Sequence, residues 1–282
     1  MNWRANKCVL VTTANSLGAI AVIRSLGKAG YRVLACAGSP NALGFHSAYC
    51  QQGIVEPSNA LEFFAWLDQL ILDNNMSLII PSEGFLLRVR ERFSKYQHLF
   101  PVPADEKLIY AGLSKYDLFE KYYANGLTEN LPPFLLIDEN VRKLSEQSLH
   151  GFEWPVFLKL DSSYALIEPN SEVIKCRDYN ELSIAFEKNR PIYHKMLIQG
   201  FVAGVGIGAF LCQWENVELA NFMHRRLHEV PHTGGASSYR CGWEDPIIMA
   251  DAHARMQCLG WNGVGMFEYR WNPATHKFYL LE

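Results

Sequence analysis

The chain has 282 residues, 49% of them hydrophobic and 20% charged, with a formal net charge of −3. This length suits about two domains or one large α/β unit. The small net charge and the absence of a Lys/Arg run give no reason to expect nucleic-acid or anionic-membrane binding. Seven scattered cysteines without a C-x-x-C pair are typical of a reducing compartment and exclude a disulfide framework. No run of 18 apolar residues occurs, so the sequence predicts a cytoplasmic protein without a membrane span.

The first third of the sequence predicts a Rossmann-like unit. Residues 7–12 and 31–37 are short apolar runs typical of buried strands, and an amphipathic helix is expected over residues 18–30 between them. A strand–helix–strand order implies parallel strands joined by a right-handed crossover. Two basic residues before the first run also fit a signal peptide, but polar side chains interrupt the run and favour a buried strand.

The turn after the first strand argues against an NAD site. It reads TTANSLGA and lacks the G-x-G-x-x-G fingerprint. The second strand leads into Cys36, Gly38 and Ser39 instead of an acidic residue that could bind a ribose. An NAD-dependent oxidoreductase is therefore disfavoured.

A second candidate ligand position follows the next strand. The sequence predicts a helix over residues 60–75 and a strand over 77–81, with Glu83 and Arg88 just beyond it. Open α/β sheets bind ligands at the carboxyl ends of their strands, so both residues are candidates for substrate contact. A cap or surface pair on the following helix is the favoured alternative. A proline-bearing loop then places a domain boundary within residues 98–112.

The middle of the sequence predicts a mixed α/β lobe in which one lysine stands out. Lys159 lies in the strand WPVFLKLDSS among apolar neighbours, where a cation is costly unless an anionic group lies opposite. Around it the sequence predicts helices over residues 113–125 (capped by Ser114), 141–150 and 180–188, an extended segment over 132–137, and strands over 172–176 and 196–198.

Two segments rich in glycine and polar residues follow this lobe. A strand is expected to end at residues 199–202, with a turn through Gly204, Gly206 and Gly208. Glycines there permit close backbone approach, although a bulged hairpin needs the same residues. After a strand over 217–223, a flexible loop suits the enclosure of an anion, with a solvated surface loop as the alternative. The polar residues of this loop are His224, Arg225, Arg226, His228, Thr233, Gly234, Gly235, Ser237, Ser238 and Arg240.

The last segment predicts a helix over residues 246–259 and then a β-hairpin. Strands over 264–270 and 277–282 flank a turn at Asn272-Pro273, with Glu268 in the first strand and Glu282 ending the second. A buried carboxylate needs a cation or hydrogen bonds, and two on paired strands suit Mg²⁺ bridging to nucleotide phosphates. Two edge-strand glutamates facing water are the alternative.

From Val9 to Glu282 the order of these features resembles the ATP-grasp superfamily, most closely carbamoyl-phosphate-synthase-like carboxylate–amine ligases. The resemblance rests on LSKYDLFEKYY, FLKLDSS, IQGFVAGVG, HRRLHEVPHTGGASSYR, LGWNGVGMFEYR and FYLLE, in this order after a Rossmann-like domain. It implies an α/β chain with a pre-ATP-grasp domain over residues 1–105, a central lobe over 106–198 and a carboxyl-terminal lobe over 199–282. ATP would lie between the antiparallel sheets of the two lobes.

The resemblance also implies an activity and a set of site residues. The activity would be an ATP- and Mg²⁺-dependent, ADP-forming ligase that converts a small carboxylate into an acylphosphate, which an amine then captures. Catalysis would depend on positioning and charge neutralisation. The implied residues are Lys115 and Lys159 at the phosphates, Gln199, Gly200, Phe201 and Val202 at the adenine, Glu268 and Glu282 at one or two Mg²⁺ ions, and Arg226, Arg240 and His224 at the γ-phosphate or acylphosphate.

The sequence departs from the family pattern in three places. The loop DSSYALIEPN lacks the glycines that cover phosphates in relatives, and AGVGIG lacks an acidic residue for the ribose hydroxyls. The family pattern continues Glu-x-Asn where this sequence ends, so we expect an incomplete carboxyl-terminal lobe with weak metal binding. A degenerate ATP-grasp protein that binds nucleotide without turnover is the alternative function. The sequence leaves a homo-oligomer open.

Overall fold

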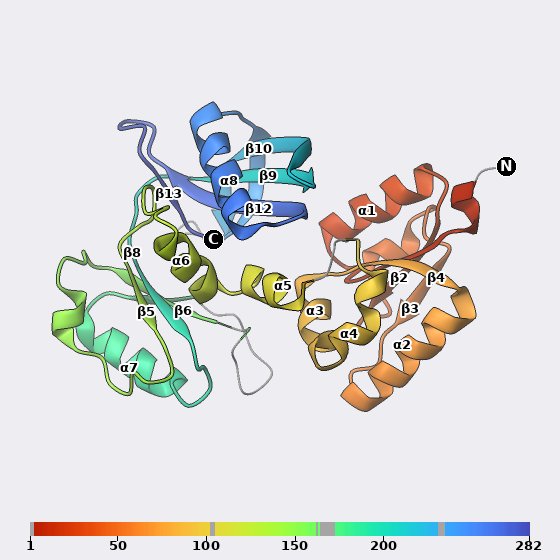
Figure 1. Ribbon diagram of the computed structural model, residues 1–282, viewed down its shortest axis with the longest axis horizontal. Helices are drawn as coiled ribbons and strands as arrows, with labels where there is room; N and C mark the ends of the chain where they lie inside the picture. Colours follow the sequence, from red (N-terminus) through yellow and green to blue (C-terminus); the bar gives the residue numbers. More distant parts are fainter. Residues whose placement is uncertain (1–2, 102–104, 162, 164–172, 231–234) are drawn as a thin grey trace. The chain divides into compact units, whose positions relative to one another are not determined.

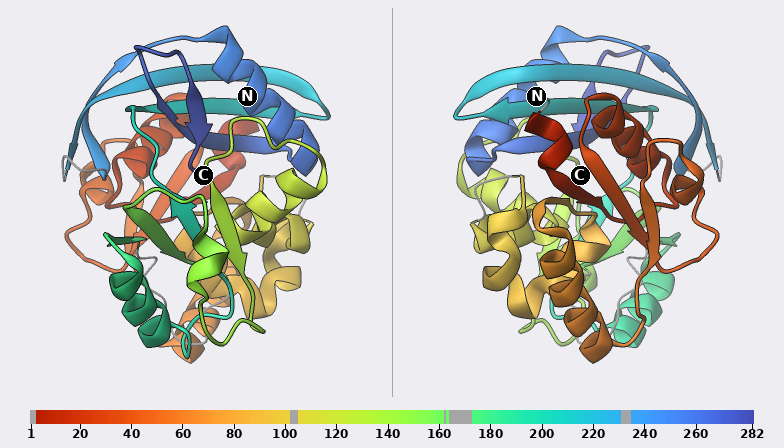
Figure 2. Two further views of the ribbon diagram at one scale, coloured as in Figure 1. Left: turned by 90° about the vertical axis from the view of Figure 1, so that its left-hand side faces the viewer. Right: turned by 90° about the vertical axis from the view of Figure 1, so that its right-hand side faces the viewer.

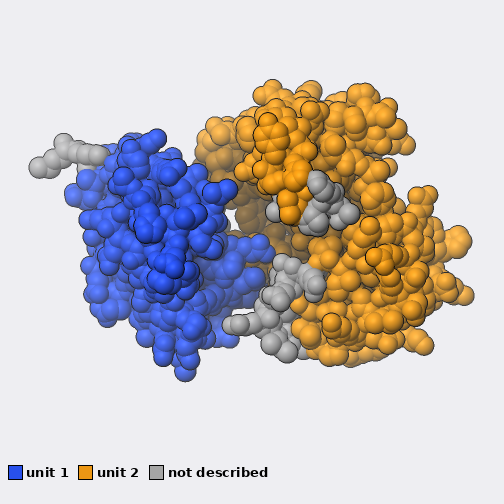
Figure 3. Space-filling model, turned by 180° about the vertical axis from the view of Figure 1, so that it is seen from behind, with its two compact units in different colours: residues 1–106 blue, residues 107–282 orange. Residues whose placement is uncertain are grey.

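Alternating apolar strands and amphipathic helices build the first of two units, Met1–Glu106 (Figures 1 and 3). The structure is a computed structural model that describes residues 3–101, 105–161, 163, 173–230 and 235–282. A parallel sheet in the order β3-β2-β1-β4 forms the centre of this unit, and β1 is buried along its whole length. The predicted strand–helix–strand unit is confirmed. The elements are η1 (Trp3–Asn6), β1 (Cys8–Val11), α1 (Leu17–Lys28), β2 (Arg32–Ala37), η2 (Leu43–His46), β3 (Gln52–Val55), α2 (Ala60–Asn74), β4 (Met76–Ile80), α3 (Glu83–Val89), η3 (Arg90–Arg92), α4 (Phe93–Tyr96) and η4 (Gln97–Leu99).

Arg88 has a structural role within this unit. Its guanidinium carbon lies 3.8 Å from the centroid of the Phe63 ring, and one guanidinium nitrogen lies 3.8 Å from a carboxylate oxygen of Glu56. It also donates a hydrogen bond to the carbonyl of Pro57. A guanidinium stacked on an aromatic ring and hydrogen-bonded to the backbone stabilises local packing.

The second unit, Lys107–Glu282, contains two antiparallel sheets. The four-stranded sheet has the order β5-β8-β6-β7 and the five-stranded sheet the order β11-β10-β9-β12-β13. Helix α7 packs on the first sheet, and helices α6 and α8 share an apolar core with the second (Figures 1 and 2). The elements are α5 (Glu106–Gly112), α6 (Lys115–Ala124), β5 (Phe134–Ile137), η5 (Glu146–Leu149), β6 (Val156–Leu160), β7 (Val173–Cys176), α7 (Tyr179–Asn189), β8 (Met196–Gly200), β9 (Val205–Trp214), β10 (Val217–Val230), β11 (Ala236–Gly242), α8 (Pro246–Leu259), β12 (Gly263–Trp271) and β13 (Phe278–Leu280).

Local sequence signals explain the limits of α8, which agree with the prediction. The side chain of Asp245 caps the amino end by accepting hydrogen bonds from the backbone of the first turn, and Pro246 takes the first helical position. Gly260 ends the helix in the left-handed conformation with φ +67°. The predicted hairpin after it is also confirmed, as β12 and β13.

Three predicted local structures are wrong. The segment expected as a helix over residues 141–150 forms only η5, because its buried Leu144 and Leu149 are five positions apart and would face different sides of a helix. The expected turn through Gly206 and Gly208 is part of β9. The expected flexible loop after residue 223 is largely the hairpin of β10 and β11, in which cross-strand pairing orders the polar side chains. Two of its residues, Thr233 and Gly234, lie outside the described residues.

No helix in the described part of the chain is long and apolar enough to cross a membrane.

Candidate functional site

A cleft of about 720 Å³ lies between the two sheets of the second unit. Strands β6, β7 and β8 line one side, and β10, β12 and the segment after β13 line the other. Of the residues implied by the family resemblance, those that line it are Lys159, Gln199, Gly200, Phe201, Val202, Arg226, Glu268 and Glu282.

The lining of the cleft includes two aromatic rings and a buried amide. The rings of Phe157 and Phe201 are stacked, with centroids 6.5 Å apart and planes 30° apart. Gln199 is 2% exposed, and its side-chain nitrogen has no hydrogen-bond partner among the described residues. A buried amide without a partner is costly, so a ligand atom that accepts its hydrogen bond would stabilise the site. Stacked rings beside a hydrogen-bonding amide suit a nucleobase.

Two lysines contact the carboxyl-terminal residues of the chain: Lys159 lines the cleft, whereas Lys115 is not among its lining residues. Lys159 is buried on β6, and its ammonium donates a hydrogen bond to the carbonyl of Leu281 at 2.9 Å. Burial, followed by the nearby Lys115, lowers the pKa of Lys159 to about 8, against the opposing effect of Glu282 and Glu268. The ammonium of Lys115, at the start of α6, lies 2.6 Å from a carboxylate oxygen of Glu282. Both lysines are thus held by acceptors that a phosphate could replace.

A buried hydrogen-bond network fixes the start of α6 next to Lys159. The hydroxyl of Ser114 donates to Asp161 at 2.5 Å and accepts from the backbone of Asp117 at 3.0 Å. Asp161 also accepts from the backbone of Tyr116 at 3.2 Å. Burial raises the pKa of Asp161, and these hydrogen bonds act in the opposite direction. Asp161 therefore positions Lys115, a role that was not predicted from the sequence.

Replacing Ser114 with alanine should lower the free energy of unfolding by about 1–2 kcal/mol, because it removes a helix cap and leaves the buried Asp161 without one donor. Urea titration of the full chain measures this change. The matched control is Ser183→Ala, which removes only an exposed i,i+4 contact with Glu187 on α7. It should change stability by less than about 0.5 kcal/mol. Equal stabilities of the two variants would contradict the role given to Ser114.

The two predicted metal-binding glutamates are neighbours on the cleft wall. The backbone of Glu268 donates to the carbonyl of Glu282 at 2.8 Å, and Leu281 donates to the carbonyl of Glu268 at 2.7 Å. Burial raises the pKa of Glu268, although Arg226 opposes this by ion pairing. Burial acts in the same direction on Glu282, but Lys115, with Lys159 and Arg226, outweighs it and holds the pKa of Glu282 below its usual value.

The donor set fits a magnesium ion that is shared with phosphates. No group of three or more His, Cys, Asp or Glu side chains that could hold a metal occurs among the described residues. Mg²⁺ is usually held by one or two carboxylates together with substrate phosphates, so Glu268 and Glu282 are a sufficient protein contribution. In the structure each carboxylate is neutralised by a cation of the chain, Arg226 for Glu268 and Lys115 for Glu282.

Glycines in β9 leave space for the neighbouring polar and charged side chains of this sheet. Gly208 pairs with His224 on β10 and with Glu268 on β12. A Cβ on Gly208 would lie 2.9 Å from the His224 ring. A Cβ on Gly206 would lie 2.6 Å from both the Cδ of Arg226 and a carboxylate oxygen of Glu229. Gly206 and Gly208 are therefore needed so that side chains of β10 can lie close to the backbone of β9. The sequence predicts close backbone approach at these glycines, but in a turn and not in a strand.

The two other residues expected near the γ-phosphate differ in burial. His224 is 3% exposed, and burial, with Arg240 and Arg226 nearby, lowers its pKa, which favours the neutral imidazole at pH 7. Arg240 lies opposite Arg226 in the backbone register of β10 and β11, but it is exposed. The structure therefore brings Arg226 into the cleft and places His224 beside it on the same sheet.

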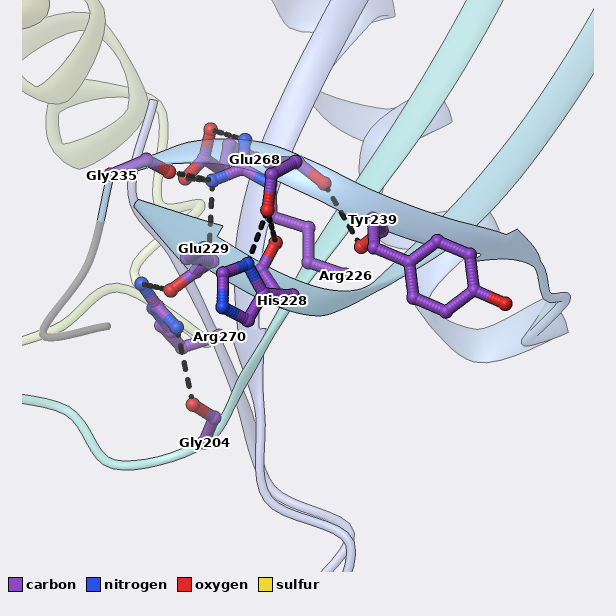
Figure 4. Close-up of polar contacts among 10 residues, drawn as sticks. Gly204, Arg226, His228, Glu229, Gly235, Tyr239, Glu268 and Arg270 are labelled. Atoms are coloured by element: carbon purple, nitrogen blue, oxygen red, sulfur yellow. Dashed lines mark hydrogen bonds and ion pairs between the residues drawn. The ribbon is translucent and has the colours of Figure 1, made fainter. Parts of the chain in front are cut away.

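Sequence reasoning missed Glu229 and Arg270, which complete the charged cluster (Figure 4). Glu229 is 9% exposed and contacts Arg226 at 3.4 Å and Arg270 at 2.9 Å. Strand alternation could have found Arg270, since it lies two residues after Glu268 on the same face. It could not have found Glu229, because irregular pairing of β10 with β11 near His228 changes the face that Glu229 occupies.

The second unit thus has two antiparallel sheets with a charged cleft between them, and the first unit has a parallel sheet. No protein-family model matches the sequence, and no curated protein matches it. Among solved structures, an L-amino acid ligase from Bacillus licheniformis is similar, with a TM-score of 0.68 at 12% identity over 98% of this chain and 66% of that one.

Two further ligases have similar folds. N5-carboxyaminoimidazole synthetase from Staphylococcus aureus, complexed with ADP, has a TM-score of 0.66 at 13% identity over 98% of this chain and 69% of that one. D-alanine–D-alanine ligase from Bacillus anthracis, complexed with ATP, has a TM-score of 0.61 at 10% identity over 98% of this chain and 83% of that one. The present chain thus has the ATP-grasp fold, as the sequence predicts, and identities this low show the fold alone.

Proposed function

We propose that the chain binds Mg·ATP in the cleft and uses it to activate a small carboxylate for capture by an amine. The observation that carries this proposal is the convergence of Lys159, Glu268 and Glu282, a buried cation beside two carboxylates, in one cleft. Two of the similar ligases were solved with ATP or ADP bound, which supports a nucleotide as the ligand of this fold.

Each side of the cleft would contribute to nucleotide binding. The stacked rings of Phe157 and Phe201 and the amide of Gln199 would hold the base. Lys159 and Lys115 would exchange their present oxygen partners for phosphate oxygens. Glu268 and Glu282 would hold Mg²⁺, which when bound neutralises phosphate charge and aligns the γ-phosphate for attack.

The proposed reaction has two displacements. A carboxylate oxygen of the substrate attacks the γ-phosphorus, the bond to the β,γ-bridging oxygen breaks, and ADP leaves. The amine then attacks the acyl carbon of the acylphosphate, loses a proton, and inorganic phosphate leaves. The residues of this chain would act by charge neutralisation: Arg226 lies beside Glu268, where negative charge on the transferred phosphoryl group would develop.

The test is ADP release by the full chain with Mg·ATP, assayed against panels of small carboxylates and amines, with calorimetry of Mg·ATP binding in parallel. We expect ADP release that depends on one carboxylate and one amine together. Binding without ADP formation for any pair would favour a nucleotide-binding protein without turnover. Absence of heat on titration with Mg·ATP would overturn both functions.

A further inference from the structure

We infer that Glu229 is a positioning residue that retains Arg226 when Glu268 binds the metal, so that Arg226 serves as a removable counter-ion of the metal site. This inference rests on the proposed function, in which Glu268 is a Mg²⁺ ligand. It concerns a carboxylate that has no direct part in holding the metal or the nucleotide.

Arg226 is shared between two carboxylates. One guanidinium nitrogen donates to Glu268 at 2.8 Å and contacts Glu229 at 3.4 Å, while it also reaches the carbonyl of Gly235 at 3.3 Å. The second nitrogen forms an ion pair with the other oxygen of Glu268. Arg226 thus occupies both carboxylate oxygens of Glu268 and already contacts a second acceptor (Figure 4).

Glu229 is fixed independently of Arg226. Its other carboxylate oxygen accepts a hydrogen bond from Arg270 at 2.9 Å, and Arg270 also donates to the carbonyl of Gly204 at 3.3 Å. Gly206 leaves the space that Glu229 and Arg226 share, since a Cβ there would lie 2.6 Å from atoms of both. The second acceptor for Arg226 therefore stays in place when Arg226 leaves Glu268.

Charge explains why a second acceptor is needed. The cluster of Arg226, Arg270, Glu229 and Glu268 is neutral as it stands, with two charges of each sign. A divalent cation on Glu268 would strongly repel the neighbouring guanidinium in this partly buried site. Arg226 must then give up Glu268, and a guanidinium that loses its carboxylate inside a protein is costly. Glu229 removes that cost.

The test is the Mg²⁺ dependence of ATP binding in Glu229→Gln. Glutamine keeps the shape of the side chain but removes the charge that retains Arg226, so Arg226 should compete more strongly for Glu268. We expect the Mg²⁺ concentration that gives half-maximal enhancement of ATP binding to rise about tenfold in calorimetry, with binding of metal-free ATP changed less than twofold. Glu187→Gln, at an exposed position of α7, should match the parent chain in both measurements.

A double-mutant cycle separates positioning from folding. In an Arg226→Met background, Glu229→Gln should shift the Mg²⁺ requirement less than twofold, because the competitor for Glu268 is gone. A shift that persists in that background, or equal weakening of metal-free and Mg²⁺-bound ATP, would assign Glu229 a merely structural role and overturn the inference. If Glu229→Gln does not fold, Glu229→Asp, which keeps the charge but shortens the reach, should raise the Mg²⁺ requirement about threefold, and no change would overturn it.

The same data distinguish this inference from the proposed function. Absence of any Mg²⁺ effect on ATP binding by the parent chain would remove Glu268 as a metal ligand, and the inference with it. A clear Mg²⁺ effect in the parent chain that is identical in Glu229→Gln would overturn the role of Glu229 alone.

Discussion

Replacement of Lys159 by methionine should weaken Mg·ATP binding by roughly 10- to 150-fold. The ammonium is buried beside Glu268 and Glu282 in the cleft, and a charge-assisted hydrogen bond in such a site contributes about 1.5–3 kcal/mol. Methionine keeps the length of the apolar stem, so the substitution removes the charge with little change in packing. Calorimetry at pH 7 measures the loss, with circular dichroism to establish folding. Binding by Lys159→Met within threefold of the parent chain would exclude Lys159 from the phosphate site.

The same residue predicts a pH dependence. With its pKa lowered to about 8, Lys159 is protonated below pH 8 and neutral above it. An anionic phosphate prefers the protonated form, so affinity should be constant at lower pH and fall as the pH rises through about 8. Lys159→Met should show no such fall. Lys175→Met is the matched control, because Lys175 lines the cleft but is exposed. The affinity of Lys175→Met for Mg·ATP should stay within about fivefold of that of the parent chain and should show the same pH dependence.

Glu268→Gln should remove the Mg²⁺ dependence of ATP binding and lower ADP release at least 100-fold. The amide keeps an oxygen that can accept from Arg226 but lacks the negative charge that Mg²⁺ requires of its protein ligands. Truncation to alanine is less informative, because it leaves the buried Arg226 without one carboxylate and destabilises the fold. The measurement is Mg²⁺ titration at fixed ATP concentration, with Glu218→Gln on β10 as the control. A Mg²⁺ titration curve that coincides with that of the parent chain would refute the metal role.

Features that depend on a few adjacent residues could be predicted from the sequence. Asp245, Pro246 and Gly260 mark the ends of α8, and the turn at Asn272 marks the hairpin that carries Glu268. Lys159 stood out because a lysine among apolar strand neighbours needs an anionic partner, and the structure places it beside two glutamates. Each of these signals depends on a few adjacent residues, so no tertiary information was needed.

The rest of the site depends on contacts between strands that the sequence does not encode locally. Glu229 reaches the face of Arg226 only because pairing is irregular near His228. The placement of Gly206 and Gly208 inside β9 follows from the side chains of β10 that lie over them. The carbamoyl-phosphate-synthase-like relationship, the cytoplasmic location, a homo-oligomeric state, the three-part division of the chain and the individual site roles stay predictions.

The contacts of Lys159 and Lys115 have a mechanical consequence. Lys159 extends from the four-stranded sheet to the carbonyl of Leu281 beside the end of β13, so this one side chain ties the two sides of the cleft together. Lys115, at the start of α6, pairs with the carboxylate of Glu282 on the same side. A polyphosphate that draws the Lys159 ammonium away from Leu281 would replace this tie as the link between the sheets. The stiffness of the second unit would then report on occupancy.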